Sequence, residues 1–317
     1  MRKFSSQLRL GALAVLLAIA ASGCDQIGAI KAKVAFRDAN VFYQRQQYQE
    51  AAEKYEEAIA ANPDLGEAYF YLGNSYDNQY RPARRGEAAN DQLMDKAISN
   101  YKIAFERSEN PVVRLRSLQF LVNAYGAEKL NDPSQQEPIL KQMIELDPNE
   151  PGNYFVLANV YEQSGDYEQA EQLLLKAREV KPGDPSVYTT LANFYNRQGD
   201  FDKTMEALHA RAEQEPNNPE AYQMIAAYYW EKAYRDFTVP TAQKVKYIQE
   251  GHKAVDKALE LKGDYVDALS YKNLLLRAQA LVEKDPKVQQ QLLADAKKYE
   301  AQAADTKNKQ RASGAGD

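Results

Sequence analysis

Few side chains in this sequence could act as nucleophiles, general bases or metal ligands. Cys24 is the only cysteine among the 317 residues. The two histidines, His209 and His252, show no metal-ligand spacing such as H-E-x-x-H, and the sequence contains neither a G-x-S-x-G turn nor a Walker-type phosphate loop. Because the acidic residues follow helical surface spacing, often near Lys or Arg, we expect solvated faces rather than acid–base pairs. The sequence therefore predicts that the protein is not an enzyme and holds no cofactor and no metal.

A short apolar segment stands before the cysteine. Arg2, Lys3 and Arg9 give the start of the chain a positive charge, and an apolar run of 12 residues follows at 10–21. A membrane-spanning helix needs about 20 such residues. A positive start, a short apolar core and small residues at the end are typical of a secretion signal.

The end of that segment, Ala21-Ser22-Gly23-Cys24, resembles the lipobox of bacterial lipoproteins, although Ala21 stands where leucine is commoner. The resemblance implies that residues 1–23 are removed and that the Cys24 thiol takes a diacylglycerol. The alternative is an ordinary cleavable signal followed by an incidental cysteine. We favour lipidation, because a lone cysteine in an exported protein cannot form an internal disulfide.

The net charge of the chain bears on its partners, and the residue after Cys24 bears on its location. The whole chain has a formal charge of -5, so it lacks the basic surface on which nucleic-acid binding depends. Asp25, directly after the cysteine, resembles an inner-membrane retention signal of enteric bacteria, a rule that does not hold across bacteria. We expect a lipid-anchored protein of the bacterial cell envelope, outside the cytoplasm, on either the inner or the outer membrane.

The middle of the chain repeats the same residue types with a period of 34. The repeated set is Tyr154, Leu157, Ala158 and Tyr161, then Tyr188, Leu191, Ala192 and Tyr195, then Tyr222, Ile225, Ala226 and Tyr229. Each set has the spacing of one helix stripe. A glycine such as Gly165 and a second stripe, Ala170, Leu174 and Ala177, follow before a closing proline. The pattern resembles the tetratricopeptide (TPR) repeat, which implies helical hairpins that stack on their neighbours.

Weaker copies extend over about residues 31–301, and insertions at 77–92 and 231–247 enlarge the second and sixth repeats. The expected fold is all-α. It is an α-solenoid of about seven TPR-like helical hairpins with two enlarged units and a C-terminal capping helix, expected at about 288–301.

The predicted boundaries follow from these patterns. They are a lipoprotein signal peptide at 1–23, a lipid-anchored tether at 24–30, a TPR solenoid at 31–303 and a disordered tail at 304–317, where no apolar pattern remains.

In the TPR family the first helix of each repeat lines the concave surface, so the stripe beside the core stripe is expected to face a groove. Six of the seven repeats place asparagine at one position of this stripe, and Ala227 is the exception. Such a row can hydrogen-bond the backbone of an extended peptide, or it can bond within the scaffold. The candidate peptide-binding residues are Phe36, Asn40, Tyr43, Phe70, Asn74, Asn123, Phe155, Asn159, Asn193, Asn196, Trp230 and Asn273. Phe36 and Phe70 replace the basic partners that a dicarboxylate clamp of this family requires.

Both insertions contain residues with more than one interpretation. Arg81, Arg84 and Arg85 could meet anionic lipid headgroups or form a solvated loop. The segment around Phe237 could cover part of the groove, meet a partner or merely lengthen two helices.

Two functions therefore remain. The first is a membrane-anchored scaffold or adaptor that binds partner proteins or extended peptides in its concave groove. The alternative is a glycan- or small-molecule-binding accessory protein of envelope polymer assembly or export.

Overall fold

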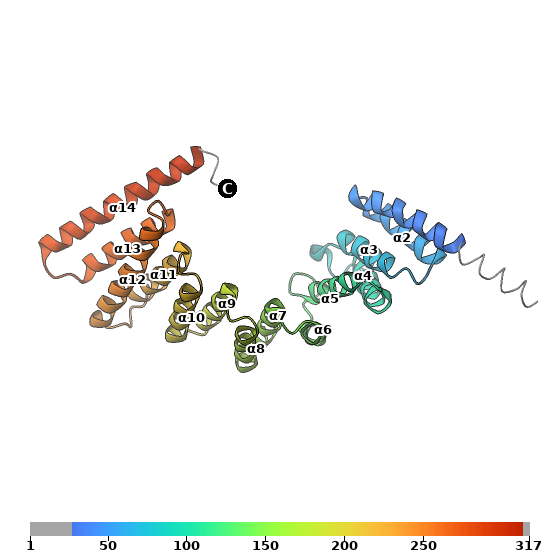
Figure 1. Cartoon of the computed structure of the whole chain (residues 1–317), viewed down its shortest axis with the longest axis horizontal. Coiled ribbons are helices and arrows are strands. Elements are labelled where there is room, and N and C mark those ends of the chain that lie inside the picture. Colours follow the sequence, from blue (N-terminus) through green and yellow to red (C-terminus); the bar gives the residue numbers. More distant parts are fainter. Residues whose placement is uncertain (1–26, 313–317) are drawn as a thin grey trace, which may run out of the picture. The chain divides into compact units, whose positions relative to one another are not determined.

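The computed structural model describes residues 27–312, so the predicted signal peptide, Cys24 and residues 313–317 lie outside the described residues. Over that range the regular elements are fourteen α-helices and one short 3-10 helix (Figure 1). The chain forms two units, one up to Pro148 and one from Asn149. None of the described helices is both long and apolar enough to span a membrane.

The N-terminal unit contains three helical hairpins. Its helices are the first helix at residues 27–44, α2 (Tyr48–Ala61), α3 (Gly66–Gln79), α4 (Ala88–Arg107), α5 (Pro111–Tyr125) and α6 (Pro133–Leu146). The second-repeat insertion forms the 3-10 helix η1 (Pro82–Arg84) and lengthens α4.

The C-terminal unit contains four hairpins. Its helices are α7 (Pro151–Gln163), α8 (Tyr167–Val180), α9 (Pro185–Arg197), α10 (Phe201–Gln214), α11 (Pro219–Arg235), α12 (Thr241–Leu261), α13 (Val266–Val282) and α14 (Pro286–Ala312). The insertion in the sixth repeat lengthens α11 and α12 and leaves a short loop at 236–240. The predicted all-α solenoid of helical hairpins is confirmed.

Local sequence signals define the helix ends. α9 and α11 each begin with proline at the first position, preceded by Asp184 or Asn218, whose side chain accepts a hydrogen bond from a backbone N–H of the first turn. These residues supply the acceptor that the free N–H groups of a helix start require. Gly165 takes a φ of 81° at the turn between α7 and α8, a value that glycine adopts without steric cost.

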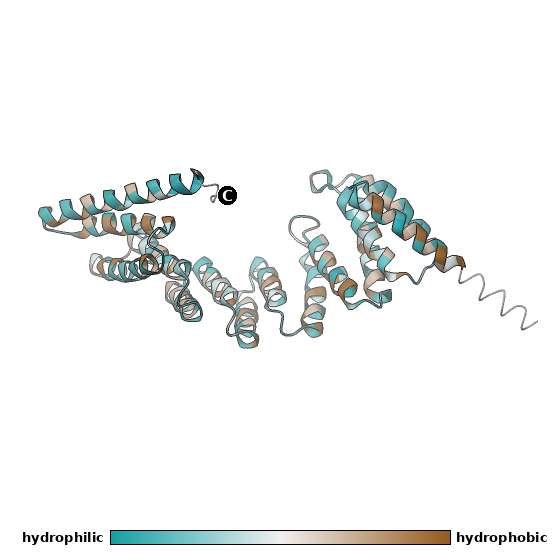
Figure 2. Ribbon diagram, turned by 45° about the horizontal axis from the view of Figure 1, so that its top comes forward, coloured by the Kyte–Doolittle hydropathy of each residue, from teal (hydrophilic) through white to brown (hydrophobic). Residues whose placement is uncertain are grey.

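The repeated apolar stripes form the core of each hairpin. Ala170, Leu174 and Ala177 are buried, as are Tyr154 and Leu157 of the facing helix. Small alanines on one helix let the tyrosines and leucines of the other approach closely, so the residue types of the repeat set the distance between the helices. Figure 2 shows apolar and polar residues alternating around the helices of both units.

Two predicted boundaries are wrong. The first helix begins at residue 27, inside the segment expected to be a tether, because Gly28 packs against the end of α2; an added Cβ would lie 2.8 Å from the Ala61 carbonyl oxygen. The last helix, α14, continues to Ala312, although disorder was expected from residue 304. Ala303 is buried there, and Lys309 pairs with Asp305 across one helical turn at 2.6 Å.

Candidate functional site

The predicted groove aromatics of the N-terminal unit pack into one aromatic cluster. Its rings are Phe36, Tyr43, Tyr48, Tyr55, Phe70, Tyr71, Tyr101 and Phe120, with neighbouring centroids 5.2 to 6.0 Å apart. Phe70 is buried, while Phe36 and Tyr43 are half-buried. The cluster joins the first helix, α2, α3, α4 and α5, so these rings hold neighbouring repeats together.

Two asparagines of the predicted row accept hydrogen bonds from tyrosines of this cluster. Tyr55 Oη donates to Asn40 Oδ1 at 2.6 Å, and Tyr43 Oη donates to Asn74 Oδ1. Asn74 is only 5% exposed. In the N-terminal unit the asparagine row thus contributes hydrogen bonds within the scaffold at these two positions, whereas Asn123, on α5, is exposed.

A buried carboxylate continues this polar network. Asp77, one turn after Asn74 on α3, accepts from Tyr101 Oη at 3.2 Å and pairs with Lys129 of the loop before α6. Burial, and then the charge of Asp77, raise the pKa of Tyr101, so the hydroxyl stays protonated and donates. The network ties α3, α4 and the α5–α6 loop together. The nearby arginines are exposed: Arg84 pairs with Glu87 of its own loop.

The asparagine row of the C-terminal unit is more open. Asn159 and Asn196 are exposed and Asn193 is half-buried, with Tyr228 Oη donating to it at 3.4 Å. Gln163 donates to Asn159 at 2.7 Å from the same helix. Asn273 is half-buried and accepts from Arg277 Nε at 2.8 Å.

In the same unit an ion pair joins the first helices of two neighbouring repeats, α7 and α9. Arg197, on α9, binds Glu162, on α7, through two hydrogen bonds of 2.7 and 2.8 Å. Phe155, also on α7, is half-buried. This two-bond geometry fixes the α7–α9 spacing beside the exposed asparagines.

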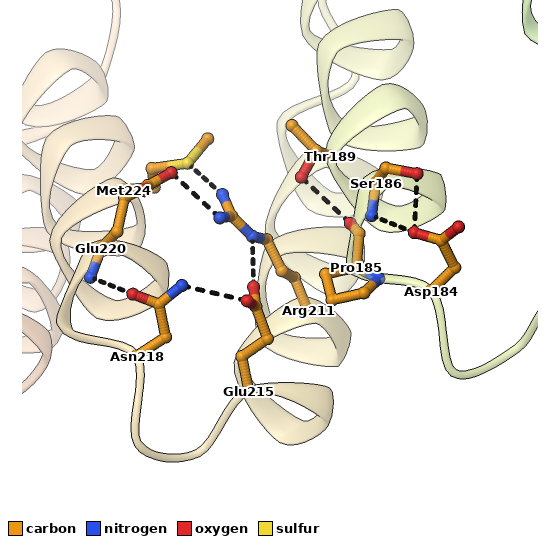
Figure 3. A network of polar contacts seen from close by, with 9 residues as sticks. All are labelled: Asp184, Pro185, Ser186, Thr189, Arg211, Glu215, Asn218, Glu220 and Met224. Atoms are coloured by element: carbon orange, nitrogen blue, oxygen red, sulfur yellow. Dashed lines mark hydrogen bonds and ion pairs between the residues drawn. The ribbon is translucent and has the colours of Figure 1, made fainter. Parts of the chain in front are cut away.

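A buried arginine fixes the start of α11. Arg211, on α10, is 7% exposed and pairs with Glu215 at 2.9 Å and Glu220 at 3.0 Å, while its Nη1 lies 2.6 Å from Met224 Sδ (Figure 3). Asn218, in the turn between the two helices, donates to Glu215 and caps α11 (Figure 3). These contacts position the helix that carries Trp230.

Trp230 is half-buried on α11. It stacks on Tyr234 with ring centroids 5.3 Å apart and meets Tyr271 edge-on. Its ring packs against a cluster of Ala233, Ile248 and Ala278. The same three residues line a surface hollow of about 580 Å³.

This surface hollow, which we call the α11–α13 hollow, lies at the end of α11 and α13. Its further lining residues are Tyr234, Arg235, Phe237, Val239, Thr241, Lys244, Leu281 and Val282. Phe237 is 90% exposed and Leu281 is 70% exposed, so two large apolar side chains stand in solvent at its edge. Lys244 lies over the Phe237 ring at 5.7 Å, and Arg235 pairs with Glu231.

Sequence reasoning identified the segment around Phe237, and Trp230 next to the hollow, but not the other residues that line it. Leu281 and Lys244 were missed, although the extra length and aromatic content of residues 231–247 were visible. In residues 27–312 no group of three or more His, Cys, Asp or Glu side chains is placed to hold a metal ion.

Comparisons with known proteins agree with this architecture. Models of the tetratricopeptide repeat match residues 130–194 and 185–228, and a TPR repeat model matches residues 39–79. The fold and these matches define a helical-repeat protein, an α-solenoid. The chain contains tetratricopeptide repeats. No curated protein matches it significantly.

Solved structures match the chain at low sequence identity. The C-terminal part of a TPR repeat-containing protein from Cytophaga hutchinsonii is 18% identical with a TM-score of 0.57, covering 86% of this chain and 98% of that one. A tetratricopeptide repeat protein from Parabacteroides merdae is 14% identical with a TM-score of 0.46, covering 84% and 98%. YrrB, described as a TPR protein with an unusual peptide-binding site, is 18% identical with a TM-score of 0.39, covering 57% and 85%.

Proposed function

We propose that this protein is a lipid-anchored scaffold of the bacterial cell envelope that binds partner proteins or extended peptides through its C-terminal unit. Attachment at Cys24 is supported by the leader and the lipobox-like sequence before it. Partner binding is supported by a repeat fold that runs from residue 27 to residue 312 and leaves part of each helical hairpin exposed to solvent.

The observation that carries the binding proposal is the α11–α13 hollow. Exposed Phe237 and Leu281 stand beside an apolar floor of Ala233, Ile248 and Ala278. Contiguous apolar side chains that are exposed to solvent mark interaction sites. Tyr, Trp and Arg are the residue types that carry most of the binding energy at protein interfaces. Trp230 packs against the same three residues and belongs to the helix stripe that the sequence assigns to the groove.

The exposed asparagines lie on α7 and α9 of the same unit, and Tyr228 of α11 donates a hydrogen bond to Asn193 of α9 at 3.4 Å. Asn159 and Asn196 offer amide donors and acceptors to solvent. A peptide whose apolar side chain fills the hollow can continue along such side chains, which hydrogen-bond its backbone whatever its sequence.

The first experiment captures partners with the full-length lipidated chain from the membranes of the organism that makes it. The parent is compared with a Phe237→Ser, Leu281→Ser variant. A Val112→Ser, Tyr167→Ser variant, which changes two exposed apolar residues outside the hollow, is the control. We expect defined proteins that the parent and the control enrich and the hollow variant loses at least about tenfold, because each large side chain contributes about 1.5–3 kcal/mol when it is buried. Equal recovery by all three chains would exclude the hollow.

The same capture tests the asparagine row. An Asn159→Ala, Asn193→Ala variant that recovers the partners as well as the parent does removes the row from the binding mechanism. The size of the hollow, about 580 Å³, also falls in the range of small-molecule pockets. No enriched protein, together with a thermal shift on adding glycans, would favour the accessory-protein alternative.

A further inference from the structure

The first helix has one packed face and one exposed apolar face. Ala32 and Ala39 are buried, and Gly28 lies so close to α2 that an added Cβ would be 2.8 Å from the Ala61 carbonyl oxygen. The helix is therefore an integral part of the N-terminal hairpin. Its opposite face is exposed in the described part of the chain.

Four branched aliphatic side chains form that outer face. Ile27, Ile30, Val34 and Val41 follow one another at helical spacing and are 57%, 64%, 44% and 41% exposed. We call them the outer stripe. Figure 2 shows apolar residues along this helix, which is the blue helix at the start of the described chain in Figure 1. Terminal helices of repeat proteins normally need a polar outer face, so an apolar one requires a partner.

Cationic side chains flank the outer stripe. Lys31 and Lys33 are exposed on the same helix, and Arg37 is exposed beside Asp38, with which it pairs. On a helical projection Lys31 falls on one edge of the outer stripe, and Lys33 and Arg37 fall on the other. An apolar stripe between basic edges is the arrangement by which a helix lies in the headgroup region of an anionic bilayer.

We propose that the outer stripe lies on the surface of an anionic membrane. The assignment rests on the proposed attachment at Cys24, which stands three residues before Ile27 in the sequence. Acyl chains at that cysteine hold the start of this helix at the bilayer. The stripe then inserts its aliphatic side chains between headgroups while Lys31, Lys33 and Arg37 meet lipid phosphates. The contact fixes the N-terminal hairpin on the membrane instead of leaving it free on a tether.

The test uses the unacylated chain from Asp25 to Asp317, which contains every described helix. It is sedimented with vesicles of equal parts phosphatidylcholine and phosphatidylglycerol, and with phosphatidylcholine vesicles alone. We expect binding to the anionic vesicles that weakens as salt is added. An Ile30→Ser, Val34→Ser variant is expected to bind about tenfold or more weakly, and a Lys31→Glu, Lys33→Glu variant is expected to lose its preference for anionic vesicles.

The control is a Val156→Ser, Leu293→Ser variant, which changes two exposed aliphatic side chains on α7 and α14 and should bind like the parent. Thermal melting by circular dichroism shows whether each variant stays folded. Equal binding of the stripe variant and the parent, or no binding by the parent, overturns the proposal. So does a dimer that only the stripe variant dissociates, because the stripe would then meet a second copy. Whether Cys24 is acylated is read separately, from the mass of the full chain purified from membranes.

Discussion

At the scale of single residues, burial decides what a polar side chain does. Asn74 and Asn159 occupy the same place in the repeat, yet Asn74 is buried against Tyr43 and Asn159 is exposed. His252 shows the same effect on a titrating group. It lies on α12 with Nδ1 3.3 Å from Lys272 Nζ of α13, and that lysine also donates to Asp256 at 2.6 Å.

Stability is expected to depend on pH through His252. Burial, and then the charge of Lys272, lower the pKa of His252 to about 4, against an ordinary value of about 6.5. Between these values the unfolded chain binds a proton that the folded chain does not, so the free energy of unfolding falls as the pH drops through this window. We expect this residue to account for a loss of about 1–3 kcal/mol near pH 4.

Urea denaturation at several pH values checks this expectation. A His252→Gln variant should lose part of the acid destabilisation, whereas His209→Gln, at an exposed position, should keep it. If the two variants have the same dependence on pH as the parent, His252 does not control it.

At the scale of elements, turns and caps set where each helix begins. The α7–α8 turn uses Gly165 at a φ of 81°, and the α9–α10 turn uses Gly199 at 76°. Asp166 and Asp200 then cap the following helices. The same turn thus returns after 34 residues because its glycine and its capping aspartate both recur.

Replacing the turn glycines is expected to destabilise the fold. Gly165→Ala or Gly199→Ala should each lower the free energy of unfolding by about 1 kcal/mol, since a Cβ disfavours this backbone conformation. Gly183, in the α8–α9 loop, is the matched control because its φ is not positive and an added Cβ would meet nothing within 4 Å. Thermal melting should therefore separate Gly183→Ala from the other two. A similar melting temperature for all three variants would contradict the prediction.

At the scale of the whole molecule, stability is a sum of hairpins and of the contacts between neighbours. Arg211 contributes to one such contact. It lies 34 residues after Ala177, so a buried arginine takes the place of a small core residue in the fifth repeat. Its ion pair with Glu220 joins α10 to α11, and its pair with Glu215 holds the residue that ends α10.

Removing the Arg211 side chain is expected to destabilise the neighbouring repeats. Arg211→Ala should cost about 1–3 kcal/mol, because it removes charge-assisted hydrogen bonds and leaves space in the core. Hydrogen exchange followed by mass spectrometry should show faster exchange in α9 to α12 and unchanged exchange in α3 and α4. Arg178→Ala, at an exposed position on α8, is the control. Uniformly faster exchange would argue against nearest-neighbour stability.

The sequence by itself determined the helices, their pairing into hairpins and the buried stripes, because period, turn glycines and caps are local properties. Only the tertiary structure decided which side chains of the asparagine row stay exposed. It also decided that Asp77 meets Lys129, 52 residues away, and that the first helix turns its outer stripe to solvent. The physical reason is that periodicity assigns a residue to a face of its own helix, whereas the neighbouring element decides whether that face is covered.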